Sequence, residues 1–240
     1  MSDFTYKNGQ LHAEDISLLE IAKRHNTPCY IYSKKAIQTK YTEFDLAFTS
    51  NQHLICYAVK ANSNISILNI LAKMGSGFDI VSSGELFRVL KAGGSPDKVV
   101  FSGVGKRLDE MKFALEQNIK CFNVESKSEL LKLNEIAESM KVSAPVSLRV
   151  NPDVDAKTHP YIATGLKENK FGISFELAKD IFKQAAKMSN INLIGIDCHI
   201  GSQISELSPF QDALQKLLDL IDELTKIGIQ LHHVDVGGGL

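Results

Sequence analysis

The sequence of 240 residues carries almost no net charge and contains no long apolar run. Its 27 basic and 28 acidic residues leave a formal charge of -1, which argues against nucleic acid as a partner because phosphate binding needs a clustered basic surface. No apolar run approaches the roughly 18 residues of a membrane span, and the first residues lack the basic and apolar order of a signal peptide. We therefore expect a globular protein that binds neither nucleic acid nor membrane.

Cysteine is also scarce and is not arranged for cross-links or metal. The cysteines lie far apart and mostly inside apolar runs, at Cys29, Cys56, Cys121 and Cys198. There is no CxxC pair and no Cys/His spacing of a metal site. The sequence therefore predicts free thiols, no metal centre and a reducing compartment, for which the cytoplasm is the simplest choice.

What the sequence does contain is a regular alternation of strand-like and helical segments. Strand-like runs start near residues 54, 78, 98, 121, 146, 193 and 232, with amphipathic helical stretches between them. The first starts lie 20 to 25 residues apart, which is about the length of one strand, one helix and two short loops. Such alternation predicts a parallel sheet. Seven successive units predict a (β/α)8 TIM barrel that lacks its last unit, and a doubly wound sheet is the alternative.

Capping signals mark several of the expected helix ends. Ser82 and Ser126 each precede a glutamate by three residues, in the order of a capping box, and Ser174 is placed to start a later helix. Gly93-Gly94 and Gly228 stand where helices should end.

Residues 1–33 have no place in this alternation. We expect a short helix over residues 15–25 and a strand over residues 29–32, before Ser33 caps the next helix. The sequence therefore predicts two domains, residues 1–33 as part of one and residues 34–240 as the barrel.

Three predicted strands carry polar residues on one face only. Because side chains alternate across a strand, three pairs each share a face: Ser147 with Arg149, Asp197 with His199, and His233 with Asp235. A solid barrel interior is filled mostly by branched aliphatic side chains. Polar residues that point inward near the carboxyl ends of strands predict a ligand site instead.

Lys60 is an unusual charge, because it ends the apolar run of residues 54–59. Desolvation at the end of a buried strand would lower the lysine pKa, which is the condition that a nucleophilic amine needs. A strand-end lysine that reaches solvent is the simpler interpretation of this residue taken alone.

Other polar residues also admit two interpretations. His199 could be a packed core histidine or a functional one, and Asp197 could orient it or fill the barrel interior. Arg149 needs a partner if it is buried, and Asp79 or Asp197 could form that ion pair.

The remaining charged residues are expected to be solvated. The loop over residues 151–171 is long enough to be a lid, and Lys157 and His159 in it are expected to face solvent. The same holds for three charges on one predicted helix, Glu129, Lys132 and Glu135.

Two glycine-rich segments, Gly201-Ser202-Gln203 and Gly237-Gly238-Gly239, follow late strands. Glycine lets backbone N–H groups approach phosphate oxygens, and in a (β/α)8 barrel phosphate often binds at the loops after the late strands. A GGG segment alone is usually only a turn.

Six segments in register give the chain a family resemblance. YAVKAN (57–62), FDIVSSGE (78–85), HIGSQ (199–203) and DVGGGL (235–240) resemble the pyridoxal-phosphate decarboxylases of the alanine-racemase-like fold. LRVNPDV (148–154) and TGLKENKFGI (164–173) look most like the diaminopimelate decarboxylase branch of that family. The resemblance covers essentially the whole chain.

The resemblance implies pyridoxal 5'-phosphate as cofactor and assigns residues to it. Lys60 would hold the cofactor as an internal aldimine and His199 would stack on its ring, so these two would be the catalytic residues. The implied cofactor-binding set is Lys60, Asp79, Arg149, His199, Ser202, Gly237, Gly238 and Gly239. The implied reaction is decarboxylation of meso-2,6-diaminopimelate to L-lysine and CO2, the last step of lysine biosynthesis. Two alternatives stay open: a decarboxylase of ornithine, arginine or carboxynorspermidine, and a homologue that binds the cofactor without catalysis.

Members of this family continue past the point that corresponds to Leu240. They add an eighth strand, a glutamate that pairs with the cofactor ring nitrogen, and a β-domain that completes the site across a dimer interface. The resemblance therefore implies that residues 1–33 pack into that β-domain and that the protein is a homodimer with shared active sites. We expect residues 1–240 alone to be inactive and to expose two unpaired sheet edges.

Overall fold

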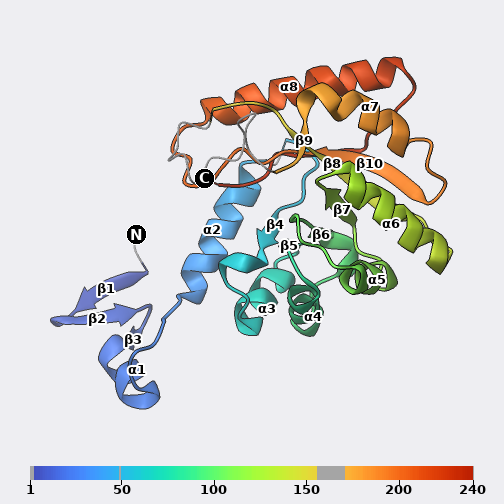
Figure 1. Ribbon diagram of the computed structural model, residues 1–240. Helices are drawn as coiled ribbons and strands as arrows, with labels where there is room; N and C mark the ends of the chain where they lie inside the picture. Colours follow the sequence, from blue (N-terminus) through green and yellow to red (C-terminus); the bar gives the residue numbers. More distant parts are fainter. Residues whose placement is uncertain (1–2, 49, 156–170, 240) are drawn as a thin grey trace.

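The structure is a computed structural model that describes residues 3–48, 50–155 and 171–239. Its main feature is a curved sheet whose outer face is covered by helices (Figure 1). Seven strands follow one another in the order β11-β10-β8-β7-β6-β5-β4, and the short β9 pairs with β8 beside this path. All pairs in this sheet are parallel.

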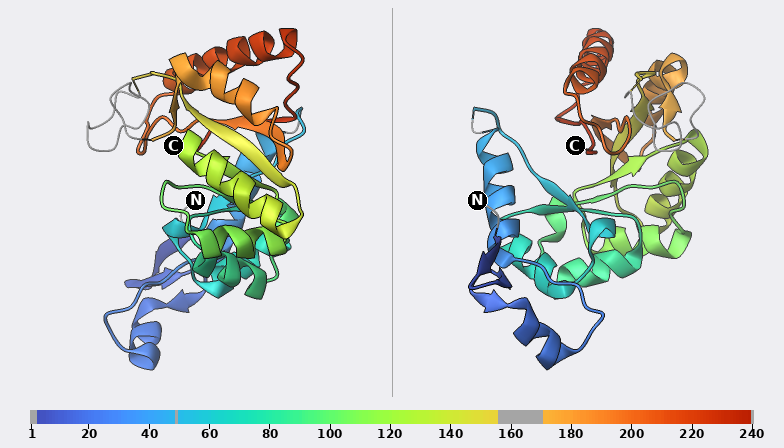
Figure 2. Two further views of the ribbon diagram at one scale, coloured as in Figure 1. Left: turned by 45° about the vertical axis from the view of Figure 1, so that its right-hand side comes forward. Right: turned by 90° about the vertical axis from the view of Figure 1, so that its left-hand side faces the viewer.

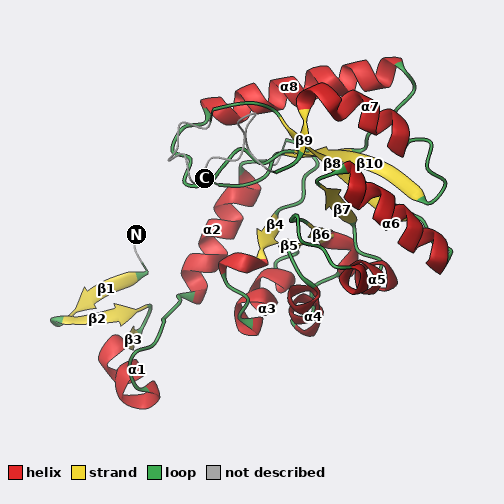
Figure 3. Ribbon diagram, viewed as in Figure 1, coloured by secondary structure: helices red, strands yellow, loops and turns green. Residues whose placement is uncertain are grey.

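The strands of this sheet are β4 (Cys56–Ala58), β5 (Gly77–Ile80), β6 (Val99–Phe101), β7 (Cys121–Val124), β8 (Ala144–Asn151), β9 (Ile173–Ser174), β10 (Ile191–Asp197) and β11 (His233–Asp235). The helices around it are α2 (Lys34–Leu46), α3 (Ile65–Lys73), α4 (Ser83–Lys91), α5 (Leu108–Glu116), α6 (Lys127–Met140), α7 (Phe175–Ala185) and α8 (Ser208–Lys226), with short 3-10 turns η1 (Val59–Ala61) and η2 (Pro96–Lys98). Strands and helices alternate along the chain, and Figure 3 distinguishes them by colour.

The strand order decides between the two predicted architectures. Spatial order follows chain order from β4 to β11, so the sheet winds in one direction, as in a (β/α)8 barrel, and does not reverse as a doubly wound sheet would. Figure 2 shows the helices in an arc on the outside of the sheet. The predicted barrel with seven of its strands is confirmed, and the doubly wound alternative is wrong.

The hydrophobic core lies between the sheet and these helices. Phe78, Phe101 and Phe122 are fully buried, and the rings of the last two stack at 5.9 Å. These side chains alternate along the strands with polar neighbours such as Asp79 and Asn123. The apolar face of the sheet therefore packs on the helices, which leaves a polar inner face.

The predicted helix caps are found. The hydroxyl of Ser82 accepts from the N–H of Glu85 (3.3 Å), and that of Ser126 accepts from the N–H of Glu129 (3.2 Å). Ser174 is the N-cap of α7. Gly93 and Gly228 follow α4 and α8 with φ of 85° and 84°, which is the left-handed conformation that favours glycine after a helix.

The amino-terminal segment forms a small sheet of its own. β1 (Phe4–Lys7), β2 (Gln10–Ala13) and β3 (Ile16–Ser17) pair antiparallel, and α1 (Leu18–His25) follows. This unit lies at the lower left in Figure 1, away from α7 and α8. None of the described helices is long and apolar enough to cross a membrane.

Two expectations for this segment are wrong. The helix begins at Leu18 and not at residue 15, because residues 16–17 pair with β2 and the Ser17 hydroxyl caps the helix. Residues 29–32 form a loop, and Tyr30 in it is 91% exposed. Aromatic residues favour a strand only where a neighbouring strand and a packed face exist. The expected lid lies largely outside the described residues, and so do Lys157 and His159.

Candidate active site

The inner face of the sheet gathers polar side chains from strands that are distant in sequence. Asp197 on β10 lies in register with Arg149 on β8 and with Asp235 on β11. Because all three strands run parallel, their carboxyl ends meet at one edge. The prediction that the polar faces of these strands come together is confirmed.

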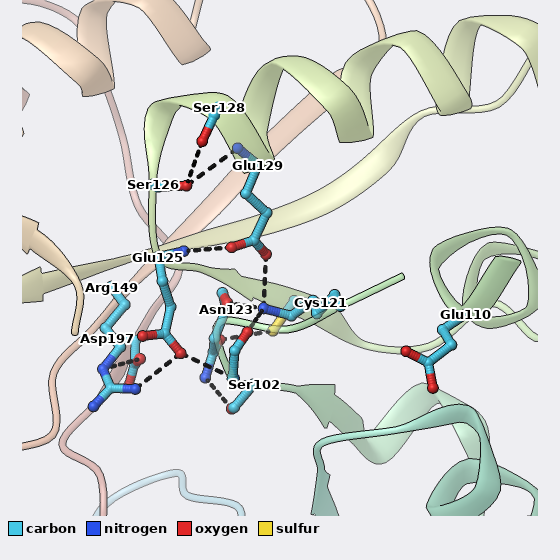
Figure 4. A network of polar contacts seen from close by, with 12 residues as sticks. Ser102, Glu110, Cys121, Asn123, Glu125, Ser126, Ser128, Glu129, Arg149 and Asp197 are labelled. Atoms are coloured by element: carbon cyan, nitrogen blue, oxygen red, sulfur yellow. Dashed lines mark hydrogen bonds and ion pairs between the residues drawn. The ribbon is translucent and has the colours of Figure 1, made fainter. Parts of the chain in front are cut away.

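Arg149 is held by two carboxylates. Its Nη1 donates to Oε1 of Glu125 (3.0 Å), and its Nε lies 3.9 Å from Oδ2 of Asp197. Figure 4 shows both acidic side chains directed at the guanidinium. Burial raises the pKa of Asp197 well above its usual value, with the Asp235 carboxylate adding to the rise and Arg149 opposing it. Of the two partners predicted for Arg149, Asp197 is therefore found and Asp79 is not the ion-pair partner.

Glu125 is a site residue that the sequence analysis missed. It directly follows β7, and its side chain is only 2% exposed. An acidic residue just after the carboxyl end of a parallel strand is a usable signal. Glu125 was not recognised because it also stands directly before Ser126, the N-cap of α6, where an acidic residue is common for helix capping alone.

A second line of hydrogen bonds crosses the sheet next to this pair. Nδ2 of Asn123 donates to Oγ of Ser102 (3.2 Å) and to Oδ2 of Asp235 (3.2 Å). Burial raises the pKa of Asp79 to about 6, opposed by a hydrogen bond from Ser102. Oδ1 of Asp79 has no hydrogen-bond partner among the described residues, so this carboxylate presents a free acceptor to the inner face.

We expect Asp79→Asn to stabilise the cofactor-free full-length protein at pH 8 by about 1–3 kcal/mol and to have little effect near pH 4. The pKa of Asp79 rises from 3.8 to about 6 on folding, so the stabilisation from proton uptake is complete below the unfolded value and is lost as pH rises through about 6. The asparagine is neutral at every pH and avoids that loss. Urea unfolding across this pH range measures the difference, and a gain that does not vary with pH would contradict the assignment.

Lys60 does not lie where the sequence placed it. β4 ends at Ala58, and Lys60 stands in the 3-10 turn η1 with its side chain exposed. The predicted desolvation at a buried strand end is therefore wrong, because β4 is an edge strand of this sheet. The charge of Lys60 nevertheless acts on both Asp79 and His199, which places the amine at the same edge as those residues.

The two glycine-rich loops lie against each other. A side chain on Gly239 would overlap the carbonyl of Gly201, and the N–H of Ile204 donates to the Gly239 carbonyl (2.7 Å). Gly237 has φ of 71°, and an added Cβ would lie 2.6 Å from the Cys198 carbonyl. Around Gly238 an added Cβ would meet nothing within 4 Å. The loops are thus closely packed on one side and open at Gly238. Ser202 is exposed beside them.

His199 is tied to the glycine loop as a neutral ring. The N–H of Gly238 lies 3.2 Å from Nδ1 of His199, so Nδ1 accepts this bond and the ring proton of the neutral form is on Nε2. Burial, together with the nearby charges of Arg149 and Lys60, lowers the pKa of His199 to about 4. The N–H of Gly237 donates to Oδ1 of Asp235 (2.8 Å), so two of the glycine amides are already used within the protein.

One of the charges predicted to be solvated is buried. The side chain of Glu129 is 10% exposed and lies 2.7 Å from Nζ of Lys106, itself 1% exposed. Lys132 and Glu135 further along α6 are 48% and 61% exposed, as predicted. Glu129 differs because it stands in the first turn of α6, where its carboxylate accepts from the N–H of Glu125 (3.0 Å).

These residues fit the cofactor that the resemblance implied. The open side at Gly238 gives a phosphate room to approach the backbone, the buried Oδ1 of Asp79 lacks a donor among the described residues, and neutral His199 suits contact with an aromatic ring. Lys60 supplies a primary amine at the same edge. The structure brings these predicted residues together, and Ser202 lies beside them on the surface.

Comparison with known proteins agrees with this fit. Residues 34–240 match the family described as "Pyridoxal-dependent decarboxylase, pyridoxal binding domain". Over its whole length the chain is 55% identical to diaminopimelate decarboxylase of Pseudomonas aeruginosa and 57% identical to that of Vibrio cholerae, and it spans 58% of each. The crystal structure of diaminopimelate decarboxylase from Helicobacter pylori complexed with L-lysine superposes with a TM-score of 0.91 at 46% identity, over 93% of this chain and 57% of that one.

The chain therefore spans little more than half the length of these relatives, and the family match covers its whole barrel sheet. On that match, the chain belongs to the pyridoxal-dependent decarboxylases and contains their pyridoxal-binding domain.

Proposed function

We propose that this chain is the cofactor-binding part of an enzyme that decarboxylates meso-2,6-diaminopimelate to L-lysine and CO2. The observation that carries the proposal is the meeting of Lys60, Asp79 and His199 at one edge of the sheet, beside the open Gly238 loop. Identity of 55% and 57% to two diaminopimelate decarboxylases over the whole chain supports this substrate, as does the L-lysine held in the H. pylori structure.

Each predicted site residue would have its own role in binding the cofactor. Bound at this edge, pyridoxal phosphate supplies an electron sink for the charge left when CO2 departs. Lys60 is the attachment amine, and its exposure leaves it accessible to the cofactor. His199 contributes a neutral ring whose orientation is fixed by the N–H of Gly238. The loop of Gly237–Gly239 and Ser202 would take the phosphate.

Arg149 and Asp79 complete the proposed site. The guanidinium of Arg149 is paired with the carboxylates of Glu125 and Asp197. Because these pairs fix its position, Arg149 would orient polar groups of the cofactor. Asp79 has one oxygen bound to Ser102 and the other without a partner among the described residues, so it would accept a proton or hydrogen bond from the cofactor.

Substrate profiling of the purified full-length protein tests the proposal. We expect CO2 release from meso-diaminopimelate with kcat/KM at least about 10^3-fold above that for ornithine, arginine or carboxynorspermidine, because a site built for one polar substrate end discriminates strongly. Preference for one of the others would make the protein a sister decarboxylase. Cofactor binding without turnover of any of them would make it a non-catalytic homologue.

The proposal extends to the organisation of the whole protein. Residues 1–33, with a sheet separate from the barrel sheet, would belong to a second domain, and the enzyme would be a homodimer with shared active sites. Four free cysteines fit a cytoplasmic location. Residues 1–240 span 58% of these relatives, and we expect them to be inactive on their own. β4 and β11 each have one unpaired edge among the described strands, which would favour aggregation. CO2 release by this fragment would contradict the expected inactivity.

A further inference from the structure

A buried lysine outside the proposed cofactor site has all its protons engaged. Nζ of Lys106 donates to the carbonyls of Gly103 and Asn123 and to Oε1 of Glu129, each at 2.7 Å. An ammonium group has three protons, so none remains for a ligand. Its position is therefore fixed by three separate segments: the loop after β6, the strand β7 and the first turn of α6.

Glu129 connects this lysine to the residue that holds Arg149. While Oε1 of Glu129 accepts from Lys106, its Oε2 accepts from the backbone N–H of Glu125 (3.0 Å). Glu125 stands between β7 and the cap of α6. The carboxylate of Glu129 thus fixes the backbone from which the Glu125 side chain extends.

Glu125 and Lys106 together hold one residue of the loop after β6, Gly103, by its N–H and its carbonyl. Oε1 of Glu125 accepts from the N–H of Gly103 (2.9 Å) and from Nη1 of Arg149 (3.0 Å). Nζ of Lys106 donates to the carbonyl of the same glycine. Ser102, the preceding residue, hydrogen-bonds Asp79. The contacts of Glu125 with Arg149 and with the loop after β6, together with the bond from Ser102 to Asp79, therefore connect both site residues to this loop. Figure 4 shows Glu125, Ser102 and Arg149 close together.

We propose that the buried Lys106–Glu129 ion pair is a positioning device that fixes Glu125 and the Ser102-Gly103 loop, and through them holds Arg149 and Asp79 in the geometry that the cofactor site needs. The inference rests on the proposed function. Stability alone does not account for the pair, because replacing a buried ion pair by apolar residues of similar volume is often neutral or stabilising. An apolar pair could not form these hydrogen bonds, so it would not fix the position of Glu125 or of the Ser102-Gly103 loop.

The test uses the double variant Lys106→Met/Glu129→Leu in the full-length protein, which removes both charges and preserves volume. The matched control is Lys132→Met/Glu135→Leu, which removes an exposed ion pair from the same helix α6. Hydrogen exchange of the Arg149 Nε–H is followed by NMR in the cofactor-free protein, with the signal assigned from Arg149→Lys. Thermal unfolding confirms that each variant is folded, and kcat and KM are measured with cofactor.

We expect exchange at Arg149 to become at least about 10-fold faster in the double variant, and kcat to fall by about 10- to 100-fold with less change in KM, because a small misplacement of a catalytic geometry has an effect of that size. The control variant should match the wild type. Wild-type exchange in the folded double variant, or an equal effect in the control, would overturn the inference.

A second variant and a cofactor-free measurement cover the cases in which the double variant or the cofactor binding fails. If the double variant does not fold, the isosteric Glu129→Gln takes its place, and unchanged Arg149 exchange in it counts against the inference. The exchange measurement needs no cofactor. If the wild-type protein binds no pyridoxal phosphate, the proposed function is refuted, and the exchange rates still show whether the ion pair positions Arg149.

Discussion

Replacing Lys60 by alanine in the full-length protein should abolish covalent capture of pyridoxal phosphate and lower kcat/KM by more than about 10^3-fold, or about 4 kcal/mol of transition-state stabilisation. A primary amine is needed to bind the cofactor aldehyde. Lys60 is exposed at the edge where its charge acts on Asp79 and His199. Loss of the absorbance band of the bound cofactor, together with loss of CO2 release, is the measurement.

Lys60→Arg is the matched control for charge. It keeps a cation at the site but offers no amine that can form a Schiff base, so it should be as inactive as the alanine variant while perturbing Asp79 and His199 less. Lys106, which also binds Glu129 near Glu125, cannot substitute, because its three protons are donated within the protein. Activity retained in Lys60→Ala would show that another lysine carries the cofactor.

The parts of the fold that could be predicted are those with local signals. Ser82 and Ser126 cap helices because a hydroxyl and a glutamate three residues later satisfy amide groups within one turn. Alternation along a strand likewise assigned Ser147 and Arg149 to one face of β8, and Asp197 to the polar face of β10. These signals need only the geometry of a single element.

The remaining features depend on how separate segments pack together and on the order of the strands in the sheet, so they could not be predicted from single elements. Lys106, Glu125 and Glu129 come from three segments, and each looks like an ordinary surface charge in sequence. They meet because α6 begins where β7 ends and the loop after β6 folds over both. The exposure of Lys60 follows from the edge position of β4 in the sheet, and a strand pattern contains no information on which strands are edges.

Gly239→Ala should disrupt the cofactor loop even without cofactor, lowering the free energy of unfolding of the full-length protein by about 3 kcal/mol or more. Gly239 has φ of 111°, and an added Cβ would overlap the Gly201 carbonyl, which is backbone and cannot turn away. The two glycine loops would have to separate, so affinity for pyridoxal phosphate should fall with stability. Urea unfolding and cofactor titration measure the two effects.

Gly238→Ala should affect cofactor binding without affecting the stability of the same loop. An added Cβ at Gly238 meets nothing within 4 Å, so stability without cofactor should change by less than about 0.5 kcal/mol. If the phosphate occupies the open side of this loop, the methyl group stands in its path and the dissociation constant should rise by about 10-fold or more. Equal affinity in Gly238→Ala and wild type would place the phosphate elsewhere, whereas a large loss of stability would mean that the loop is packed more tightly than its contacts indicate. The combination of intact stability and weakened cofactor binding is therefore the result that assigns this loop to the phosphate.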